Sequence, residues 1–300
     1  MTEFLQDKIA IIYDFDGTLS PMPMQNYTVL PKIGIEADAF WKEVNSKFGA
    51  EKGEQMLTYM RLLLEKAEEN HIHIERHDFF EMAENIEYFP GVEDWFERIN
   101  TFVDQEGHGG VKVEHYIISA GLKEILEGTS IYEHFTNTYA SEYFYDHHGV
   151  PKFPKLLITD TSKTQFIFRI NKGKQDLTES INQHMTWYER PIPFKNIIYI
   201  GDGETDVPSM TVVQANGGNS IAVYKPEEGE EKEGKSLNIC KSLLRIGRVN
   251  FIAPADYSEN KSLETRTKIL LKSVMASIEY EKEKFESLKE NGLLHEQGNI

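Results

Sequence analysis

Two hydrophobic patterns alternate along this chain: short continuous apolar runs, and longer stretches in which apolar residues recur every three or four positions. The short runs lie around Ile9–Tyr13, Tyr116, Phe166, Ile197–Ile200, Ile221 and Asn250–Ala253. Continuous runs of this length are typical of buried strands, and the longer periodic stretches are typical of amphipathic helices. Strands that alternate with helices predict an α/β fold, with a Rossmann-like, doubly wound and mostly parallel sheet.

The interval from residue 21 to residue 88 lacks strand-like runs. Apolar positions there follow helical spacing, first from Phe40 to Phe48 and then from Met56 to Leu64. The segment Phe89-Pro90-Gly91-Val92 indicates the return to the sheet, opening another helix. We therefore divide the chain into a core of residues 1–20 and 89–300, in which 261–300 form a C-terminal helical tail, and a helical segment of residues 21–88 inserted after the first strand.

Composition narrows the class of protein. The 300 residues carry a net charge of −17, so no basic excess exists to bind a nucleic-acid backbone. One cysteine excludes an intramolecular disulfide, and no apolar run approaches the roughly 20 residues of a membrane span. The acidic N-terminus leads directly into the first strand and leaves no room for a signal peptide. We expect a cytoplasmic protein that binds neither membrane nor nucleic acid; the oligomeric state is left open.

Acidic residues follow two of the apolar runs. The first run ends in the string DFDGT, with Asp14 and Asp16, and the run at Ile197 ends in GDGETD, with Asp202 and Asp206. Carboxyl ends of parallel strands share one edge of a sheet, where open α/β folds bind their ligands. Hard oxygen ligands from separate strands suit Mg²⁺. A solvated acidic turn is the alternative for the second string taken alone.

A third strand-like run, HYIISAG at residues 115–121, ends in small residues. Its Ser119 offers a hydroxyl beside backbone N–H groups, an arrangement that suits an anion. Taken alone, Ser119 is also a plausible helix cap.

In this order, DFDGT, IISAG, a lysine and GDGETD, the motifs resemble the haloacid dehalogenase-like hydrolase superfamily, and the phosphoserine-phosphatase-like branch fits best. The resemblance implies that Asp14 is a nucleophile that carries a transient aspartyl-phosphate and that Asp16 is the acid and base. It implies Mg²⁺ held by Asp14, by the backbone carbonyl of Asp16 and by Asp202, with Asp206 beside the metal's water or the lysine. Thr18, Ser119 and Ala120 would hold the phosphate.

The family's lysine is not unambiguous in this sequence. Lys163, Lys172 and Lys174 all precede the last motif. We prefer Lys172 as the catalytic and phosphate-binding lysine, because it follows the strand-like TQFIFRI and opens a predicted helix from Gln175 to Met185. Lys174 and Lys163 remain alternatives, and any of them can be a solvated surface lysine.

The resemblance also implies that residues 21–88 form a cap that excludes water and contacts the leaving group. Aromatic and methionine residues there, among them Trp41, Tyr59 and Met60, are expected to form the cap's own core, although some of them are candidates for a leaving-group pocket. Arg61 and Arg76 are candidates for binding a carboxylate and equally plausible surface residues. His71, His73 and His77 match no helical zinc pair and are expected to be surface or structural.

The function predicted from the sequence is a Mg²⁺-dependent phosphatase that hydrolyses a small-molecule phosphate monoester. Two alternatives stay open. A phosphoryl transferase or phosphomutase on the same fold would need an acceptor other than water, and a non-catalytic phosphate-binding regulatory protein would bind phosphate without turnover.

Overall fold

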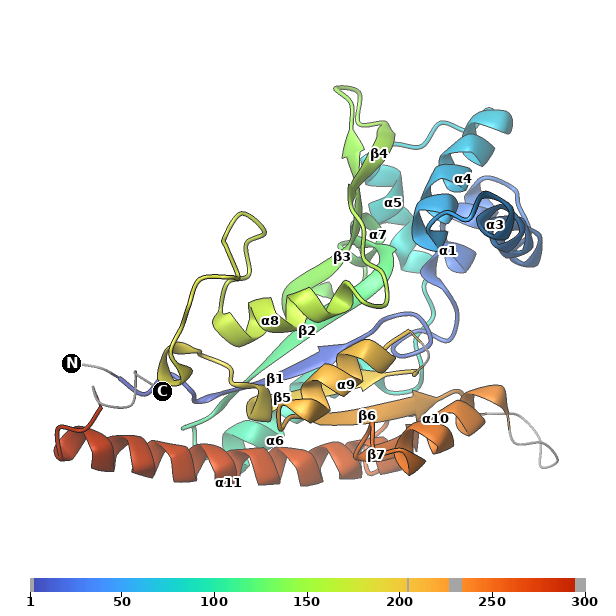
Figure 1. The fold of residues 1–300 in the computed structure, drawn as a ribbon. Helices are drawn as coiled ribbons and strands as arrows, with labels where there is room; N and C mark the ends of the chain where they lie inside the picture. Colours follow the sequence, from blue (N-terminus) through green and yellow to red (C-terminus); the bar gives the residue numbers. More distant parts are fainter. Residues whose placement is uncertain (1–2, 204, 227–233, 295–300) are drawn as a thin grey trace.

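A computed structural model describes residues 3–203, 205–226 and 234–294. Within these residues seven strands form one sheet in the order β4-β3-β2-β1-β5-β6-β7, and every neighbouring pair is parallel except β3 and β4. The strands are β1 Lys8–Tyr13, β2 Lys112–Leu122, β3 Phe135–Tyr145, β4 Pro151–Leu156, β5 Ile197–Gly201, β6 Asn219–Tyr224 and β7 Phe251–Pro254. The predicted α/β, Rossmann-like sheet is confirmed, with β1 at its centre (Figure 1).

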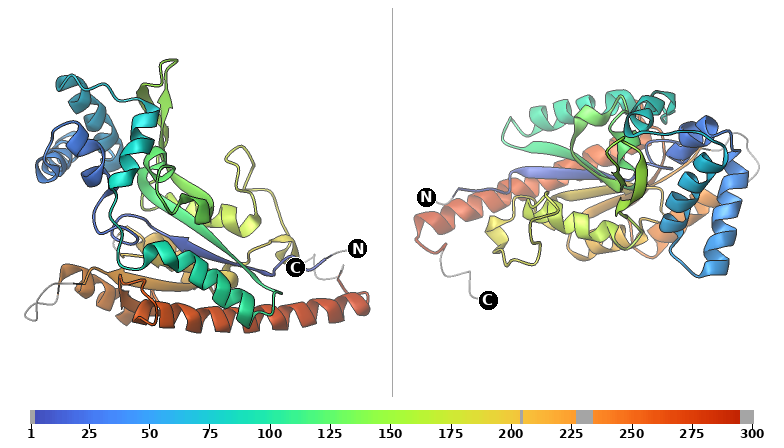
Figure 2. Two further views of the ribbon diagram at one scale, coloured as in Figure 1. Left: turned by 180° about the vertical axis from the view of Figure 1, so that it is seen from behind. Right: turned by 90° about the horizontal axis from the view of Figure 1, so that it is seen from above.

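Helices cover both faces of the sheet. Alternate residues of β1 point to opposite faces, so Ile11 and Tyr13 join one hydrophobic core while Ala10 and Ile12 join the other. The first core is completed by α6 (Val92–Glu106) and α11 (Ser262–Glu290), and the second by α8 (Lys163–Lys172), α9 (Val207–Ala215) and α10 (Lys235–Arg245). The sheet is therefore doubly wound, with helices on both of its sides (Figures 1 and 2).

A helical segment, called here the helical insert, follows β1. It comprises α1 Met24–Tyr27, α2 Val29–Lys32, α3 Ala37–Glu51, α4 Gln55–Glu69, α5 Arg76–Met82 and the 3₁₀ turn η1 Ala83–Asn85. The insert stands beyond the carboxyl end of β1, beside the ribbon of β3 and β4 (Figure 1). The chain returns at Phe89, whose N–H bonds Leu19 O at 2.9 Å, and Gly91 precedes α6 as predicted.

The connecting elements are short. They are α7 Lys123–Leu126 and the 3₁₀ turns η2 Tyr132–His134, η3 Trp187–Glu189 and η4 Phe194–Asn196. The 29-residue α11 runs along the bottom of the molecule (Figure 1), with Leu270, Val274 and Ile278 buried against the core. None of the helices within the described residues is long and apolar enough to cross a membrane.

Two local predictions were wrong. The run TQFIFRI is not a strand but most of α8, and the predicted helix from Gln175 to Met185 is a sequence of turns. Gly173, with φ of +65°, ends α8, and the carbonyls of the following turns accept bonds from Arg169 and Lys172. Tertiary packing therefore overrides the β propensity of the Ile and Phe residues. The strands β3 and β4 were not predicted, although the Thr, Tyr and Phe residues of β3 favour a strand.

Candidate active site

Asp14 lies at the centre of the sheet's carboxyl edge. It follows Tyr13, the last residue of β1, which pairs with Ile117 of β2 and Ile200 of β5. The Asp14 N–H donates to Ile200 O at 3.1 Å, and Asp14 Oδ1 accepts from the next residue's N–H, Phe15, at 2.8 Å. These bonds fix a carboxylate that is only 5% exposed.

Two motif glycines leave room for the acidic side chains of the site. Gly17 has φ of +77°, and a Cβ at this position would collide with the carboxylate of Asp202. A Cβ on Gly201 would likewise collide with the carboxylate of Asp206. A side chain at Gly17 would push apart the loops that follow β1 and β5, and one at Gly201 would displace Asp206 within the loop after β5.

A buried lysine joins the two loops. Lys163 Nζ lies 2.9 Å from Asp14 Oδ2 and 2.8 Å from Asp206 Oδ1, and the side chain is 1% exposed. The hydroxyl of Tyr199, a residue of β5, donates to the same Asp206 Oδ1 at 2.7 Å. Asp206 Oδ2 is buried and has no partner among the described residues. Asp206 thus positions Lys163, and Lys163 in turn holds the Asp14 carboxylate.

Burial and charge oppose each other at these groups. Burial alone would lower the pKa of Lys163, but Asp14 and Asp206 outweigh it and hold that pKa above its ordinary value. Burial raises the pKa of Asp14, with the Lys163 ammonium opposing the rise. Burial also raises the pKa of Asp202, and the charges of Asp206 and Asp14 add to the effect. A cation is the group that would relieve this crowding of carboxylates.

The carboxyl group of Asp16 bonds to a backbone N–H, whereas those of Asp14 and Asp206 contact Lys163. Asp16 Oδ1 accepts the N–H of Met24, the first residue of α1, at 2.8 Å. Burial, with the nearby Asp14 charge, raises the pKa of Asp16 to about 7. This value suits a group that both gives and takes a proton near neutral pH. The bond from Met24 also ties this carboxyl group to the start of the helical insert.

Three carboxylates can meet at one cation. Oxygens of Asp14, Asp202 and Asp206 all lie within 4.8 Å of one another. The donors are hard oxygens, and the unpartnered Asp206 Oδ2 is free of competing hydrogen bonds, so the residues present fit Mg²⁺.

A cavity of about 370 Å³ opens above these groups. Its floor, as we name it, consists of Asp14, Asp16, Ser119, Ala120, Lys163 and Asp202. Its wall, contributed by the helical insert, consists of Gln25, Trp41, Met56 and Tyr59. The floor is mostly charged, whereas the wall has no charged side chain.

The structure places two of the four predicted phosphate-binding residues at the cavity. Ser119 and Ala120 line the cavity where the pairing of β2 with β3 is interrupted, between Ile118 and Leu122. Thr18 does not line it. The Thr18 hydroxyl is fully buried and has no partner among the described residues. The backbone carbonyl of Thr18 accepts a hydrogen bond from the Tyr257 hydroxyl at 3.0 Å, on the core side of the loop.

The placement predicted for Lys172 is wrong. Lys172 is the last residue of α8, and its ammonium donates to Ile181 O at 2.5 Å and Gln183 O at 2.9 Å. Lys174 instead donates to Ser180 O at 3.1 Å. The lysine at the start of a helix is Lys163, because the segment read as a strand is itself that helix. Lys163 thus occupies the position for which Lys172 was proposed.

Sequence reasoning missed three residues of the site. Tyr199 was read only as part of an apolar strand, and Gln25 and Met56 were not considered for the cavity. The cluster Asp160-Thr161-Ser162 before Lys163 was an available sign of a helix start. No comparable sign marks Gln25 or Met56, whose place depends on how α1 and α4 pack over the sheet edge.

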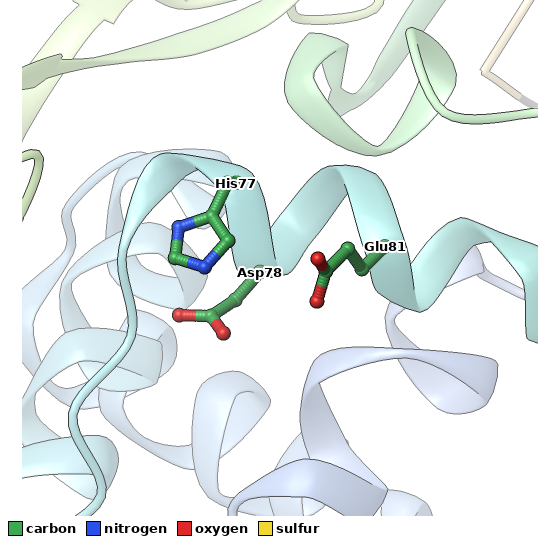
Figure 3. A group of neighbouring side chains, drawn as sticks. All are labelled: His77, Asp78 and Glu81. Atoms are coloured by element: carbon green, nitrogen blue, oxygen red, sulfur yellow. The ribbon is translucent and has the colours of Figure 1, made fainter.

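A second cluster of possible ligands lies on α5, away from this cavity. His77, Asp78 and Glu81 project from one helix (Figure 3), with ligand atoms within 4.8 Å of one another. Asp78 is occupied, since Oδ2 accepts the N–H of Glu75 at 2.6 Å as a helix cap. His77 and Glu81 are exposed, as expected for surface residues.

Known proteins resemble this chain in sequence and, more widely, in fold. No family model matches the sequence. An uncharacterized protein of Borreliella burgdorferi is 28% identical over 280 residues, which cover 85% of this chain and 93% of that protein.

Solved structures are similar at low identity. A phosphoserine phosphatase captured as a phospho-aspartyl intermediate analogue matches with a TM-score of 0.52 at 14% identity, over 88% of this chain and 99% of that one. A probable phosphoserine phosphatase of Vibrio cholerae matches with a TM-score of 0.55 at 11% identity, over 92% and 68%. A HAD family hydrolase of Salmonella enterica matches with a TM-score of 0.52 at 15% identity; the match covers 74% of this chain and 64% of that hydrolase. The chain therefore has a HAD-like fold of the phosphoserine-phosphatase type.

Proposed function

We propose that this protein is a Mg²⁺-dependent phosphatase that hydrolyses a small phosphate monoester through an aspartyl-phosphate on Asp14. The observation that carries the proposal is the pair of contacts from the buried Lys163 ammonium, 2.9 Å to Asp14 and 2.8 Å to Asp206, beneath a cavity that Asp16 and Asp202 also line. The likeness to phosphatases of the same fold supports it.

In the first step, an oxygen of Asp14 attacks phosphorus, and the bond from phosphorus to the ester oxygen breaks. Asp16 gives its proton to the departing oxygen, which its pKa of about 7 allows. Lys163 offsets the negative charge of Asp14 as the phosphate approaches, and Ser119 and the adjoining backbone of β2 hold the phosphate oxygens.

In the second step, Asp16 takes a proton from water, which attacks the aspartyl-phosphate. Free phosphate leaves and the Asp14 carboxylate is restored, so the cycle consumes one ester and one water. Asp14, Asp202 and the backbone carbonyl of Asp16 would hold Mg²⁺, with Asp206 beside them. When bound, the ion would supply positive charge against the phosphate oxygens.

The wall closes the other side of the cavity. Trp41, Met56 and Tyr59 come from α3 and α4, which supports the proposal that the helical insert is a cap. Apolar side chains there would exclude water, so that the ester and not bulk solvent occupies the floor.

The test is phosphate release from para-nitrophenyl phosphate with Mg²⁺, measured for the wild type and for Asp14→Asn. We expect release by the wild type, its loss in EDTA, its return with added Mg²⁺, and a rate lowered by about 100-fold or more in the variant. An unchanged rate in Asp14→Asn would contradict the assignment of the nucleophile. Release only in the presence of an alcohol acceptor would favour a phosphoryl transferase, and phosphate binding without turnover a regulatory protein.

A further inference from the structure

The wall of the cavity defines the class of leaving group. We propose, on the basis of the proposed phosphatase function, that the leaving group is a small alcohol that carries no carboxylate and that donates a hydrogen bond to Gln25. The sheet fold resembles that of phosphoserine phosphatases, yet phosphoserine has a carboxylate. The proposal therefore separates the substrate of this chain from the one named for its structural relatives.

The cavity offers no cation to a second anionic group. Among the described residues that line it, Lys163 is the one lysine or arginine, and its ammonium is already shared by Asp14 and Asp206. The floor also presents the carboxyl groups of Asp16 and Asp202. A carboxylate on the leaving group would lose its hydration without gaining an opposite charge, and it would face carboxylates of the same sign.

The two arginines considered for carboxylate binding are engaged elsewhere. Arg61 is an exposed residue of α4, with contacts of 2.9 Å to Glu51 and 3.4 Å to Glu65. Arg76 lies 3.1 Å from Glu127 and is 60% exposed at its side chain. Neither lines the cavity.

Gln25 indicates which polar group the leaving group carries. Gln25 is 2% exposed and lines the cavity, and its Oε1 is itself buried and has no hydrogen-bond partner among the described residues. Burial raises the pKa of the neighbouring Tyr59, and the Gln25 side chain opposes that rise. A buried amide oxygen without a partner is costly, so a hydroxyl or ammonium group of the leaving group is the natural donor to it.

The remaining wall suits a short carbon chain. Trp41 and Tyr59 lie with ring centroids 5.8 Å apart, and Met56 lines the cavity beside them. Methylene groups between the phosphate and the donor would contact these apolar surfaces. A phosphorylated amino alcohol or polyol has this pattern of phosphate, methylenes and donor.

The discriminating experiment compares two esters that differ only by a carboxylate, O-phosphoethanolamine and O-phosphoserine. We expect kcat/KM to be higher for O-phosphoethanolamine by about tenfold or more, the selectivity that an unpaired charge imposes. An equal or higher value for O-phosphoserine would overturn the inference. Hydrolysis of para-nitrophenyl phosphate is measured beside them: without release from any ester the proposed function fails and the inference falls with it, whereas release with O-phosphoserine preferred defeats the inference alone.

A gain-of-function variant tests whether a residue of the wall determines the selectivity between the two esters. Met56→Lys adds an ammonium to the cavity, and Leu57→Lys adds the same charge at the next residue, which is exposed and does not line the cavity. We expect Met56→Lys to raise kcat/KM for O-phosphoserine relative to O-phosphoethanolamine by about tenfold and Leu57→Lys to leave the ratio within about twofold. Equal shifts in both variants would assign the ratio to overall charge and overturn the inference.

Gln25→Leu tests the hydrogen-bond acceptor with nearly conserved volume. We expect kcat/KM for O-phosphoethanolamine to fall by about tenfold, since its donor loses its partner, and the value for para-nitrophenyl phosphate to change by less than about threefold. An equal loss with both esters would show that Gln25 supports the fold of the cavity and does not bind the leaving group.

Discussion

The floor and the wall of the cavity differ in how their polar groups are satisfied. On the floor, the Lys163 ammonium has two carboxylate partners, and the N–H of Met24 bonds to Asp16. On the wall, the Gln25 carbonyl oxygen has no partner in the described part of the chain, and the other wall residues are apolar or aromatic. Under the proposed function, the sheet edge therefore arranges its groups before a substrate arrives, whereas the wall leaves an acceptor for the leaving group.

The largest effect is expected from breaking the floor. Lys163→Met removes the charge between Asp14 and Asp206, so we expect kcat on para-nitrophenyl phosphate to fall by about 100-fold or more. The free energy of unfolding should fall by about 3–5 kcal/mol, because buried carboxylates lose their partner. Denaturant unfolding of the variant measures the second quantity and shows whether the first refers to folded protein.

Lys172→Met is the matched control. Its ammonium donates to two carbonyls of the turns after α8, and the residue is partly exposed. We expect kcat within about twofold of the wild type. A large loss in Lys172→Met together with a normal rate in Lys163→Met would reverse the assignment of the lysine and break the description of the floor.

These lysines also show how far the sequence determines the site. DFDGT and GDGETD each follow an apolar, strand-like run, so the sequence predicted Asp14, Asp16 and Asp202 just after strand ends, and β1 and β5 do end directly before them. Lys163 was underrated because Ile and Phe in the following residues favour a strand locally, while packing of Phe166 and Ile170 against the sheet makes the segment a helix. The wall was harder to predict from the sequence, because Gln25 and Met56 come together only through tertiary packing of α1 and α4.

A smaller effect is expected from a residue that supports the floor without lining the cavity. Tyr199→Phe removes the donor to Asp206 Oδ1, which lies 2.7 Å away. We expect kcat to fall by about tenfold with KM within about twofold, and the free energy of unfolding to fall by about 1–3 kcal/mol. A raised KM with an unchanged kcat would mean that Tyr199 affects substrate binding and not the orientation of Asp206 and Lys163.

The smallest expected effect is on the free energy of unfolding, and it depends on pH through the buried His115 of β2. His115 is buried between Tyr13 Oη and Asn100 Oδ1, each 3.0 Å away, and burial, with the His134 charge, lowers its pKa to about 3. The unfolded chain takes up a proton at the ordinary pKa of about 6.5, so this group's contribution to stability is lost as pH falls below that value. The advantage in free energy of unfolding of the wild type over His115→Gln should shrink by about 1 kcal/mol between about pH 7 and pH 5.5.

Urea unfolding of both proteins at the two pH values measures this difference, and the subtraction removes the contributions of the other titrating groups. An advantage that stays constant or grows toward acid pH would contradict a neutral, buried His115. Activity at neutral pH should remain within about threefold in His115→Gln, which separates residues that stabilise the sheet from those that form the floor.

In the proposed mechanism Asp14 carries the phosphoryl group and Asp16 moves the protons. In Asp16→Asn, para-nitrophenyl phosphate still transfers its phosphoryl group, because its leaving group needs little protonation, but water is no longer deprotonated. Acid-quenched samples of this variant, digested and analysed by mass spectrometry, should carry one phosphoryl group on the peptide that contains Asp14, and the Asp14→Asn/Asp16→Asn double variant should carry none. Release of para-nitrophenol with the phosphoryl group on another residue would contradict the account.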